Sequence, residues 1–187
     1  MVIDIWSRYL PGWMLARAEN AKLAEILLAD TITKQAIERN QLTVHSDRGS
    51  PMTAKPVAFL LADLGVTKSF SRPHISNDNP YSESQFRTMK YRPQFPVRFG
   101  SYEDAHSFCS SFFAWYNHDH RHSGIGFHTP ADVHYGRAGA IREQRALVLD
   151  AAYTSHPERF VRKAPEPPAL PTVAWINEPQ EVTATTQ

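Results

Sequence analysis

Two acidic residues occupy positions at which a carboxylate could take part in catalysis. Asp47 ends the stretch TVHSD, where a short β-branched run leads into a polar turn that Gly49 stops. Glu83 lies in the first turn of a helix that Pro80 is expected to begin, and the helix dipole favours an anion there. Two carboxylates held close together repel each other, and a divalent cation such as Mg²⁺ or Mn²⁺ relieves that repulsion. From composition alone, a helix cap and a surface salt bridge explain the two acids more simply.

Basic residues follow the glutamate. Arg87 and Lys90 come four and seven residues after Glu83, so the three share one face of the expected helix. Between residues 84 and 99 there are four basic residues and no acidic ones, although the net charge of the whole chain is only +1. Such a local field suits a phosphate backbone. Taken alone, however, the charge pattern is explained more simply as a solvated surface.

Hydrophobic periodicity predicts the elements that would carry these side chains. Alternating, β-branched stretches predict strands at 2–9, 13–16, 42–47 and 66–71. Helical spacing predicts helices at 20–39, 53–64, 80–92 and from 101 to about 116. Strands that alternate with helices in this way indicate an α/β fold, with a mixed sheet flanked by helices.

Local signals indicate where several of the helices begin and end. Thr53 is the expected cap of the second helix and Gly65 its stop. Asn77, Asp78 and Asn79 form the expected loop and cap before Pro80, and Ser101 with Asp104 resembles a capping box. The apolar stripe of the last helix is expected to form core. Its members are Ala105, Phe108, Cys109, Phe112, Trp115 and Tyr116.

Composition places the chain among globular proteins. Its 187 residues are 42% apolar, and they contain neither an apolar run long enough to span a membrane nor a signal-peptide pattern. The lone Cys109 excludes an internal disulfide and favours a cytoplasmic setting. We expect residues 137–187 to form a C-terminal extension that is Pro-rich and partly disordered from about 156, with docking limited to residues 173–176.

Four ordered blocks resemble a known family. They are DIWSRYLPGWM, HSDRGSPMT, GVTKSFSRPHISNDNPYSESQFRTMK and YNHDHRHSGIGFHTPADVHYG. The 35 residues between Asp47 and Glu83 match the second half of the DDE motif. The chain is thus identified, over residues 1–136, as similar to the catalytic core of retroviral-integrase-like DDE transposases of the bacterial insertion-sequence type.

The resemblance implies an RNase H-like core that uses Mg²⁺ or Mn²⁺ to nick transposon ends and to join them to target DNA. On that template, Asp47 and Glu83 are catalytic metal ligands, and Lys90 contacts transposon-end DNA. Arg87, Arg48 and His45 are expected at the DNA, with His45 and Arg48 either orienting the metal acid or touching phosphate. The resemblance implies DNA and other transposase subunits as partners, and no membrane. It implies a location in the bacterial cytoplasm, at the nucleoid when the protein is bound to DNA.

The family's first aspartate has no counterpart in the matched blocks. It belongs to an opening, central strand that would precede Val2, so we expect the core to lack this strand and the chain alone to be inactive. Asp4 matches a polar position outside the catalytic set and is not the expected substitute. The alternative is a non-catalytic remnant that binds DNA or associates with intact transposase subunits. A Mg²⁺-dependent phosphohydrolase of another fold would leave the four blocks unexplained.

Two further patterns carry less chemistry. The histidines at 118, 120, 122 and 128 suggest zinc, but tetrahedral sites usually include cysteine, and the chain has a single Cys. The family resemblance explains the same block as a helix end followed by a turn. Ser46 is interpreted as a turn residue, because no histidine and acid are spaced to activate it as a nucleophile.

Overall fold

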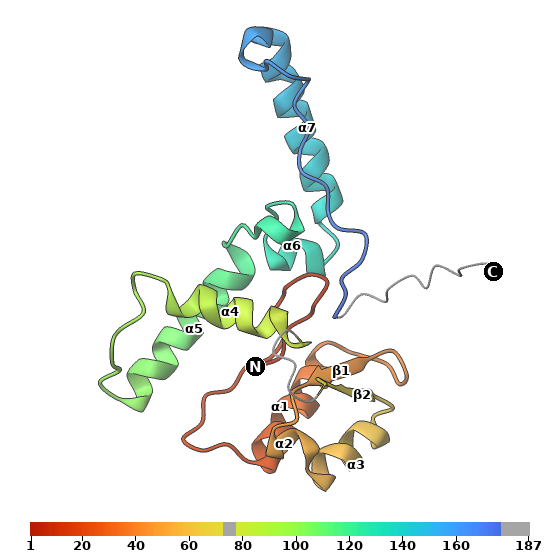
Figure 1. The fold of residues 1–187 in the computed structure, drawn as a ribbon, viewed down its shortest axis with the longest axis vertical. Coiled ribbons are helices and arrows are strands. Elements are labelled where there is room, and N and C mark those ends of the chain that lie inside the picture. The colour runs from red at the N-terminus through yellow and green to blue at the C-terminus, as the bar shows by residue number, and fades with distance from the viewer. Residues whose placement is uncertain (73–77, 177–187) are drawn as a thin grey trace, which may run out of the picture. The chain divides into compact units, whose positions relative to one another are not determined.

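The computed structural model describes residues 1–72 and 78–176, which form two compact units (Figure 1). The first unit contains Met1–Ala16 and Met89–Val173, and the second contains Arg17–Thr88 and the segment that follows Val173. Asn77, predicted to help place the helix of Glu83, lies outside the described residues. The predicted boundary at residue 136 does not coincide with either unit, and it stays a prediction about family membership.

The second unit is an α/β arrangement, as predicted. Its elements in chain order are α1 (Ala21–Lys34), β1 (Thr43–Ser46), α2 (Ser50–Thr53), α3 (Lys55–Asp63), β2 (Thr67–Phe70) and α4 (Pro80–Lys90), of which the last two residues belong to the first unit. Asn20 caps α1, since its Oδ1 accepts a hydrogen bond from the Leu23 amide at 2.9 Å. The helices predicted at 20–39 and 80–92 and the strands predicted at 42–47 and 66–71 are therefore confirmed.

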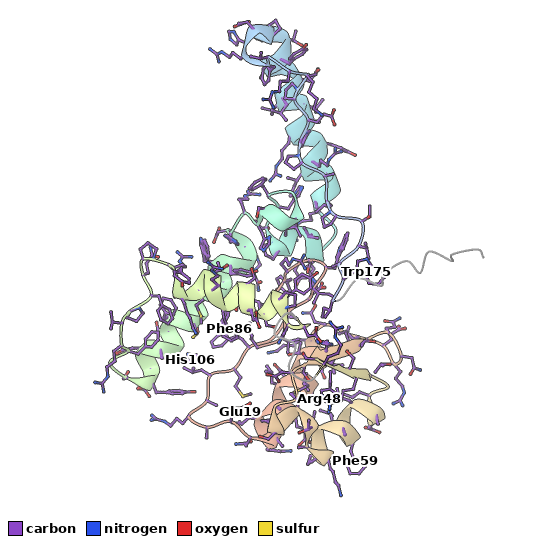
Figure 2. All side chains as sticks on the ribbon, viewed as in Figure 1. Glu19, Arg48, Phe59, Phe86, His106 and Trp175 are labelled. Atoms are coloured by element: carbon purple, nitrogen blue, oxygen red, sulfur yellow. The ribbon has the colours of Figure 1, made fainter. Side chains whose placement is uncertain are left out.

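The sheet of the described residues consists of β1 and β2, which pair in parallel. Its register places Thr43 opposite Thr67 and Ser46 opposite Phe70. Parallel pairing needs a crossover, which α2 and α3 supply, and α3 packs against both α1 and β2. Val57 and Leu61 of α3 are buried, whereas Phe59 is 71% exposed and projects from the opposite side of that helix (Figure 2). Within the described part of the chain, the sheet is therefore parallel rather than mixed.

The helix predicted at 53–64 is two helices, and Thr53 is not its cap. Pro51 and Pro56 each stand near the start of a short helix, where the missing N–H costs nothing. Thr53 ends α2, with its hydroxyl bonded to the Gly49 and Ser50 carbonyls. Gly65 does end the second helix as predicted, in the left-handed conformation (φ +66°) that glycine adopts readily.

The first unit is built around α5 (Tyr102–His118). Ser101 caps this helix by accepting the Asp104 amide at 3.0 Å, which confirms the N-terminus predicted from sequence. The predicted apolar stripe is core, because Phe112 and Tyr116 are buried while Phe108, Cys109 and Trp115 pack against them. The remaining elements of this unit are η2 (Ser123–Ile125), α6 (Pro130–His134), α7 (Ala138–Ser155) and η3 (Pro157–Arg159).

The strands predicted at 2–9 and 13–16 are wrong. The β pairing within residues 1–16 consists of one isolated antiparallel bridge, between Val2 and Gly12. The carboxylate of Asp4 accepts the Trp6 amide at 2.9 Å and the Ser7 hydroxyl at 2.6 Å, and Arg8 adopts a positive φ of 64°. A short acidic side chain that bonds the following backbone offers the chain a turn in place of a strand.

Helix α7 lies in the region predicted only as an extension. The segment after η3 runs back along α7 (Figure 1), and the Arg142 guanidinium contacts the Pro167 carbonyl. Arg145 fastens α7 to the turn before α6, donating to the carbonyls of Gly126 (3.1 Å) and Phe127 (2.8 Å). No helix among the described residues is long and apolar enough to cross a membrane.

Candidate metal and nucleic-acid site

Asp47 follows β1 at the edge of the sheet where both parallel strands end. Its side chain is exposed, and its Oδ1 accepts one hydrogen bond, from the Gly49 amide at 3.2 Å. This short loop bond orients the carboxylate without burying it. At the same edge, the Ser71 amide donates to the Ser46 carbonyl at 3.0 Å, so the backbone after β2 stays beside the backbone that leads into Asp47.

Glu83 lies in the first turn of α4, as predicted. The Glu83 amide donates to the carbonyl of Asn79 at 3.2 Å. Asn79 therefore accepts a hydrogen bond of the first helical turn and immediately precedes Pro80, the first residue of α4. The Glu83 side chain is exposed and has neither a hydrogen bond nor an ion pair within the described residues. An exposed carboxylate near a helix N-terminus is stabilised by the helix dipole and remains available to a cation.

His45 joins the two strands to the residue that leads into α4. In β1 it pairs with Ser69 of β2, and its Nδ1 lies 2.7 Å from the Ser69 Oγ. Its Nε2 lies 3.0 Å from the carbonyl oxygen of Asp78 and 3.3 Å from the Ser71 Oγ. A carbonyl can only accept, so Nε2 carries the proton, and Nδ1 accepts the Ser69 hydroxyl in the neutral ring.

Asp78 is held from its side chain as well. The carboxylate is 1% exposed and accepts three hydrogen bonds from Arg72: from the main-chain amide (2.7 Å), from Nε (3.0 Å) and from Nη2 (2.9 Å). The bidentate arrangement with a guanidinium compensates for burying the charge. The Asp78 peptide is thus bound to β1 through His45 and to the end of β2 through Arg72.

Cations gather at the strand ends near Asp47. Arg48 follows it directly, donates from Nε to the Ser71 carbonyl at 3.3 Å, and lies 5.9 Å from the Phe70 ring centre. Lys68 lies 4.7 Å from the same ring centre and bonds the Met52 carbonyl. Along α4, Arg87 and Lys90 are exposed, four and seven residues after Glu83. Arg48 is thus the chain neighbour of Asp47, and Arg87 and Lys90 lie on the same helix as Glu83.

The described residues contain no ready-made metal centre that includes Asp47 or Glu83. No group of three or more His, Cys, Asp or Glu side chains gathers there in a way that could hold an ion. Asp47 and Glu83 nevertheless fit a hard divalent cation, since both are exposed oxygen donors with open bonding capacity. Their role as metal ligands stays a prediction from the sequence.

The histidine-rich stretch does not form a zinc site among the described residues. The His122 Nδ1 accepts the Gly124 amide at 3.0 Å, and burial, followed by the charges of Arg8 and His120, lowers the pKa of His122 to about 4. His120 stacks on Tyr116 with ring centres 5.3 Å apart. His128 is fully buried beside the turn. These side chains are structural parts of the first unit.

Asp4 also has a local structural role. Its Oδ2 accepts from the Ser7 hydroxyl and lies 3.0 Å from the Nδ1 of His134, whose ring stacks on Tyr9 at 4.4 Å. Burial acts to raise the pKa of Asp4, but the bonds from His134, Ser7 and Trp6 outweigh it, and the net shift is downward. Both carboxylate oxygens are engaged within the first unit.

Sequence reasoning misses the group that holds the start of α4. From the sequence, Ser69, Ser71 and Arg72 stand out only as part of a strand or as basic charge. The signal that could reveal them is alternation, because Ser69 and Ser71 fall two residues apart, on the side of β2 that faces the ring of His45. Recognising it requires the pairing register of β1 and β2, which the sequence does not state.

Comparison with known proteins identifies the family. Two family models, each described as integrase core domain, match residues 1–76 and 64–130. The first match contains Asp47 and the second contains Glu83. The chain therefore belongs to the integrase core family, as an integrase-like DDE transposase core.

Individual relatives are similar to parts of the chain. A putative transposase for insertion sequence element IS986/IS6110 of Mycobacterium tuberculosis (strain CDC 1551 / Oshkosh) is 27% identical over 143 residues, which cover 71% of this chain and 49% of that protein. Transposase InsF for insertion sequence IS3A of Escherichia coli (strain K12) is 31% identical over 90 residues, or 48% of this chain and 31% of that one. The chain thus spans at most about half the length of these relatives.

A solved structure is also similar. The catalytic core domain of BIV integrase aligns with a TM-score of 0.44 and 23% identity, covering 68% of this chain and 78% of that one.

Proposed function

We propose that this chain is part of a DNA transposase catalytic core and contributes Asp47 and Glu83 to a site for Mg²⁺ or Mn²⁺. The observation that carries the proposal is the link between β1, which leads into Asp47, and the residue that leads into α4, through the 3.0 Å bond from His45 to Asp78. The similarity to integrase core domains and to a putative transposase supports nicking and strand transfer of DNA as the proposed reaction class.

The two acids have distinct supports. Asp47 sits at the strand end with one oxygen bonded to the Gly49 amide, which leaves the other free to bind a cation. Glu83 projects from the first turn of α4, on the helix whose exposed face carries Arg87 and Lys90. A bound divalent cation would neutralise both carboxylates and stabilise the charge on a phosphate that reacts beside them. The neighbouring cations would hold the polyanionic strand.

Paramagnetic broadening by Mn²⁺ tests the pairing of the acids. We expect a Mn²⁺ titration of the ¹⁵N-labelled chain to broaden amide signals around Asp47 and around Glu83 together, at the same metal concentration. Asp47→Asn and Glu83→Gln should each weaken both sets. The exposed Asp30→Asn, which alters an ion pair with Lys34 on α1, is the matched control and should change neither set. Broadening confined to one acid would contradict the proposal.

A nicking assay tests what these two acids achieve on their own. With two carboxylates, we expect the 187-residue chain to leave supercoiled plasmid intact in Mg²⁺ or Mn²⁺. Relaxed product that disappears in Asp47→Asn would show that the chain is already a complete nuclease. Binding without cleavage agrees both with this proposal and with the alternative of a DNA-binding or transposase-associating protein, and the Mn²⁺ titration separates the two.

DNA binding is proposed for Arg48, Arg87 and Lys90. Removing one cation that touches a phosphate should weaken duplex binding in all sequences and reduce the slope of log K against log salt by about 1. Lys90→Ala should show this change in a fluorescence anisotropy titration. Lys34→Ala removes another exposed cation, paired with Asp30 on α1, and should leave the slope unchanged. Equal slopes for both variants would exclude Lys90 from the DNA surface.

A further inference from the structure

Both ring nitrogens of His45 are hydrogen-bonded to other groups of the protein. Nδ1 is bonded to the Ser69 hydroxyl and Nε2 to the Asp78 carbonyl, with the Ser71 hydroxyl also near Nε2. The ring is half-buried, and in the neutral state each nitrogen has the partner that its donor or acceptor character requires. These bonds would have to break for the ring to contact a phosphate.

The placement of the ring follows from strand geometry. His45 pairs with Ser69 of β2, and its ring lies on the side of the sheet that meets the Asp78 peptide. Asp47 follows β1 directly, two residues after His45. Asp78 is two residues before Pro80, the first residue of α4, and Glu83 lies in that helix's first turn. The bond from His45 therefore joins the strand of one acid to the helix start of the other.

The Arg72–Asp78 pair makes this bond separable from folding. The Asp78 carboxylate stays fastened to Arg72 whether or not His45 is present, because its three bonds come from the end of β2. Loss of the imidazole should free the Asp78 carbonyl and loosen the entry to α4, while the buried ion pair and the α1–α3 packing remain. A local change in the position of Glu83 is expected, rather than unfolding.

We infer that His45 is a positioning residue, whose Nε2–H sets the start of α4, and with it Glu83, against the end of β1 that carries Asp47. The inference rests on the proposed function, because only a metal site shared by Asp47 and Glu83 requires the two acids to be held together. Of the two roles expected for His45, orienting the metal acid or touching phosphate, it favours the first. The length of the side chain is then the critical property, because it determines whether the Asp78 carbonyl is reached.

Two substitutions separate reach from bulk. In His45→Gln, the amide nitrogen occupies a place similar to Nε2 and can still donate to the Asp78 carbonyl. In His45→Asn, the amide extends only about as far as Nδ1, so it can bond Ser69 but does not reach Asp78. Ser69→Ala provides a third variant, which removes the partner of Nδ1 and leaves the Nε2 bond in place.

The test combines the Mn²⁺ titration with amide hydrogen exchange of the metal-free chain. In His45→Asn, Mn²⁺ should still broaden the amides around Asp47 but no longer those around Glu83, and His45→Gln should restore both. Without metal, the Glu83 amide should exchange about fivefold faster in His45→Asn, the factor that loss of one hydrogen bond represents. Thr88, near the other end of α4, should exchange at the wild-type rate in every variant.

The outcomes distinguish the inference from the proposed function. If wild type broadens both sets and His45→Asn does the same, the inference fails and the proposed function stands. If wild type never broadens both sets, the proposed function fails, and exchange at Glu83 decides the inference alone. Uniformly faster exchange that includes Thr88 would overturn it by showing a general structural role. Should His45→Asn not fold, Ser69→Ala must match His45→Gln in the titration, or the inference is wrong.

Discussion

The side-chain amide of Asn117 pairs with both main-chain groups of Leu10. Its Oδ1 accepts the Leu10 amide at 2.9 Å, and its Nδ2 donates to the Leu10 carbonyl at 3.0 Å, with both residues buried. The amide thereby acts as a strand partner for a segment that forms no strand of its own. It fastens the N-terminal segment to the end of α5.

Asn117→Ala should therefore be costly. It removes two buried hydrogen bonds and leaves the Leu10 groups unsatisfied, so we expect the free energy of unfolding to fall by about 2–4 kcal/mol. Urea denaturation followed by circular dichroism measures it. Asn20→Ala, which removes the exposed cap of α1, should cost about 1 kcal/mol and is the comparison. Equal losses would mean that the Leu10 pairing contributes no more than a surface cap.

Asp4 should contribute a pH-dependent part of the stability. Its pKa in the folded protein lies below the ordinary value of 3.8, so around that pH the unfolded chain binds more protons and stability rises with pH. The contribution is present above pH 3.8 and is lost as the pH falls through the lower, folded value. We expect Asp4→Asn to be less stable than wild type at neutral pH, with the difference shrinking in acid. A difference in unfolding free energy that is constant with pH would contradict this role.

Three glycines should respond differently to alanine. Gly126 has φ +64°, and a Cβ there would lie 3.1 Å from the carbonyl oxygens of Pro168 and Ala169. Gly136 has φ +71° with open space around it, whereas Gly139 in α7 has open space and no positive φ. Alanine should thus be most destabilising at 126 and less so at 136, and at 139 it should stabilise by about 0.5–1 kcal/mol. Thermal unfolding of the three variants measures the order of their stabilities. A Gly126→Ala protein as stable as Gly136→Ala would show that residues 168–169 can move away from the added Cβ at little cost.

Cys109 should react slowly in the native protein. It packs against the core of α5, and burial raises the pKa of its thiol, so that less thiolate is present near neutral pH. Reaction with a disulfide reagent at pH 8 should be at least about tenfold slower than in urea, where the ordinary thiol pKa of about 8.5 returns. Similar rates in both conditions would place the thiol at the surface.

Elements with strong periodicity and clear ends are predictable from the sequence. The helices that begin after Asn20, at Pro80 and after Ser101 are recognisable because apolar spacing and a cap or proline agree there. The predicted N-terminal strands are wrong because the side-chain bonds of Asp4 compete with the β ladder. Helix α7 escapes prediction because it is Ala-rich, with Leu147 and Val148 exposed, so no single apolar face marks it.

The candidate site is predictable in part for a similar reason. Asp47 and Glu83 are predicted because the 35 residues between them match the spacing in the family that the sequence resembles, and this spacing can be read without a structure. The bond from His45 to Asp78 joins residues 33 apart and depends on where β1 ends beside β2, so it can be seen only in three dimensions. The same holds for the pairing of Asp78 with Arg72, because nothing in the order of residues requires these two charges to meet.

The crossover between β1 and β2 makes the position of Asp47 depend on residues without any chemistry of their own. The chain from β1 to β2 passes through α3, which packs through the buried Val57 and Leu61, so this packing supports the alignment of the two strands. Contacts of this sequence separation form late in folding relative to helix turns. Removal of a methyl group from Leu61 would therefore lower the fraction of molecules in which β1 and β2 are paired, and would change the position of Asp47 in that way. The apolar volume of a helix that carries neither Asp47 nor Glu83 would thus affect where Asp47 lies.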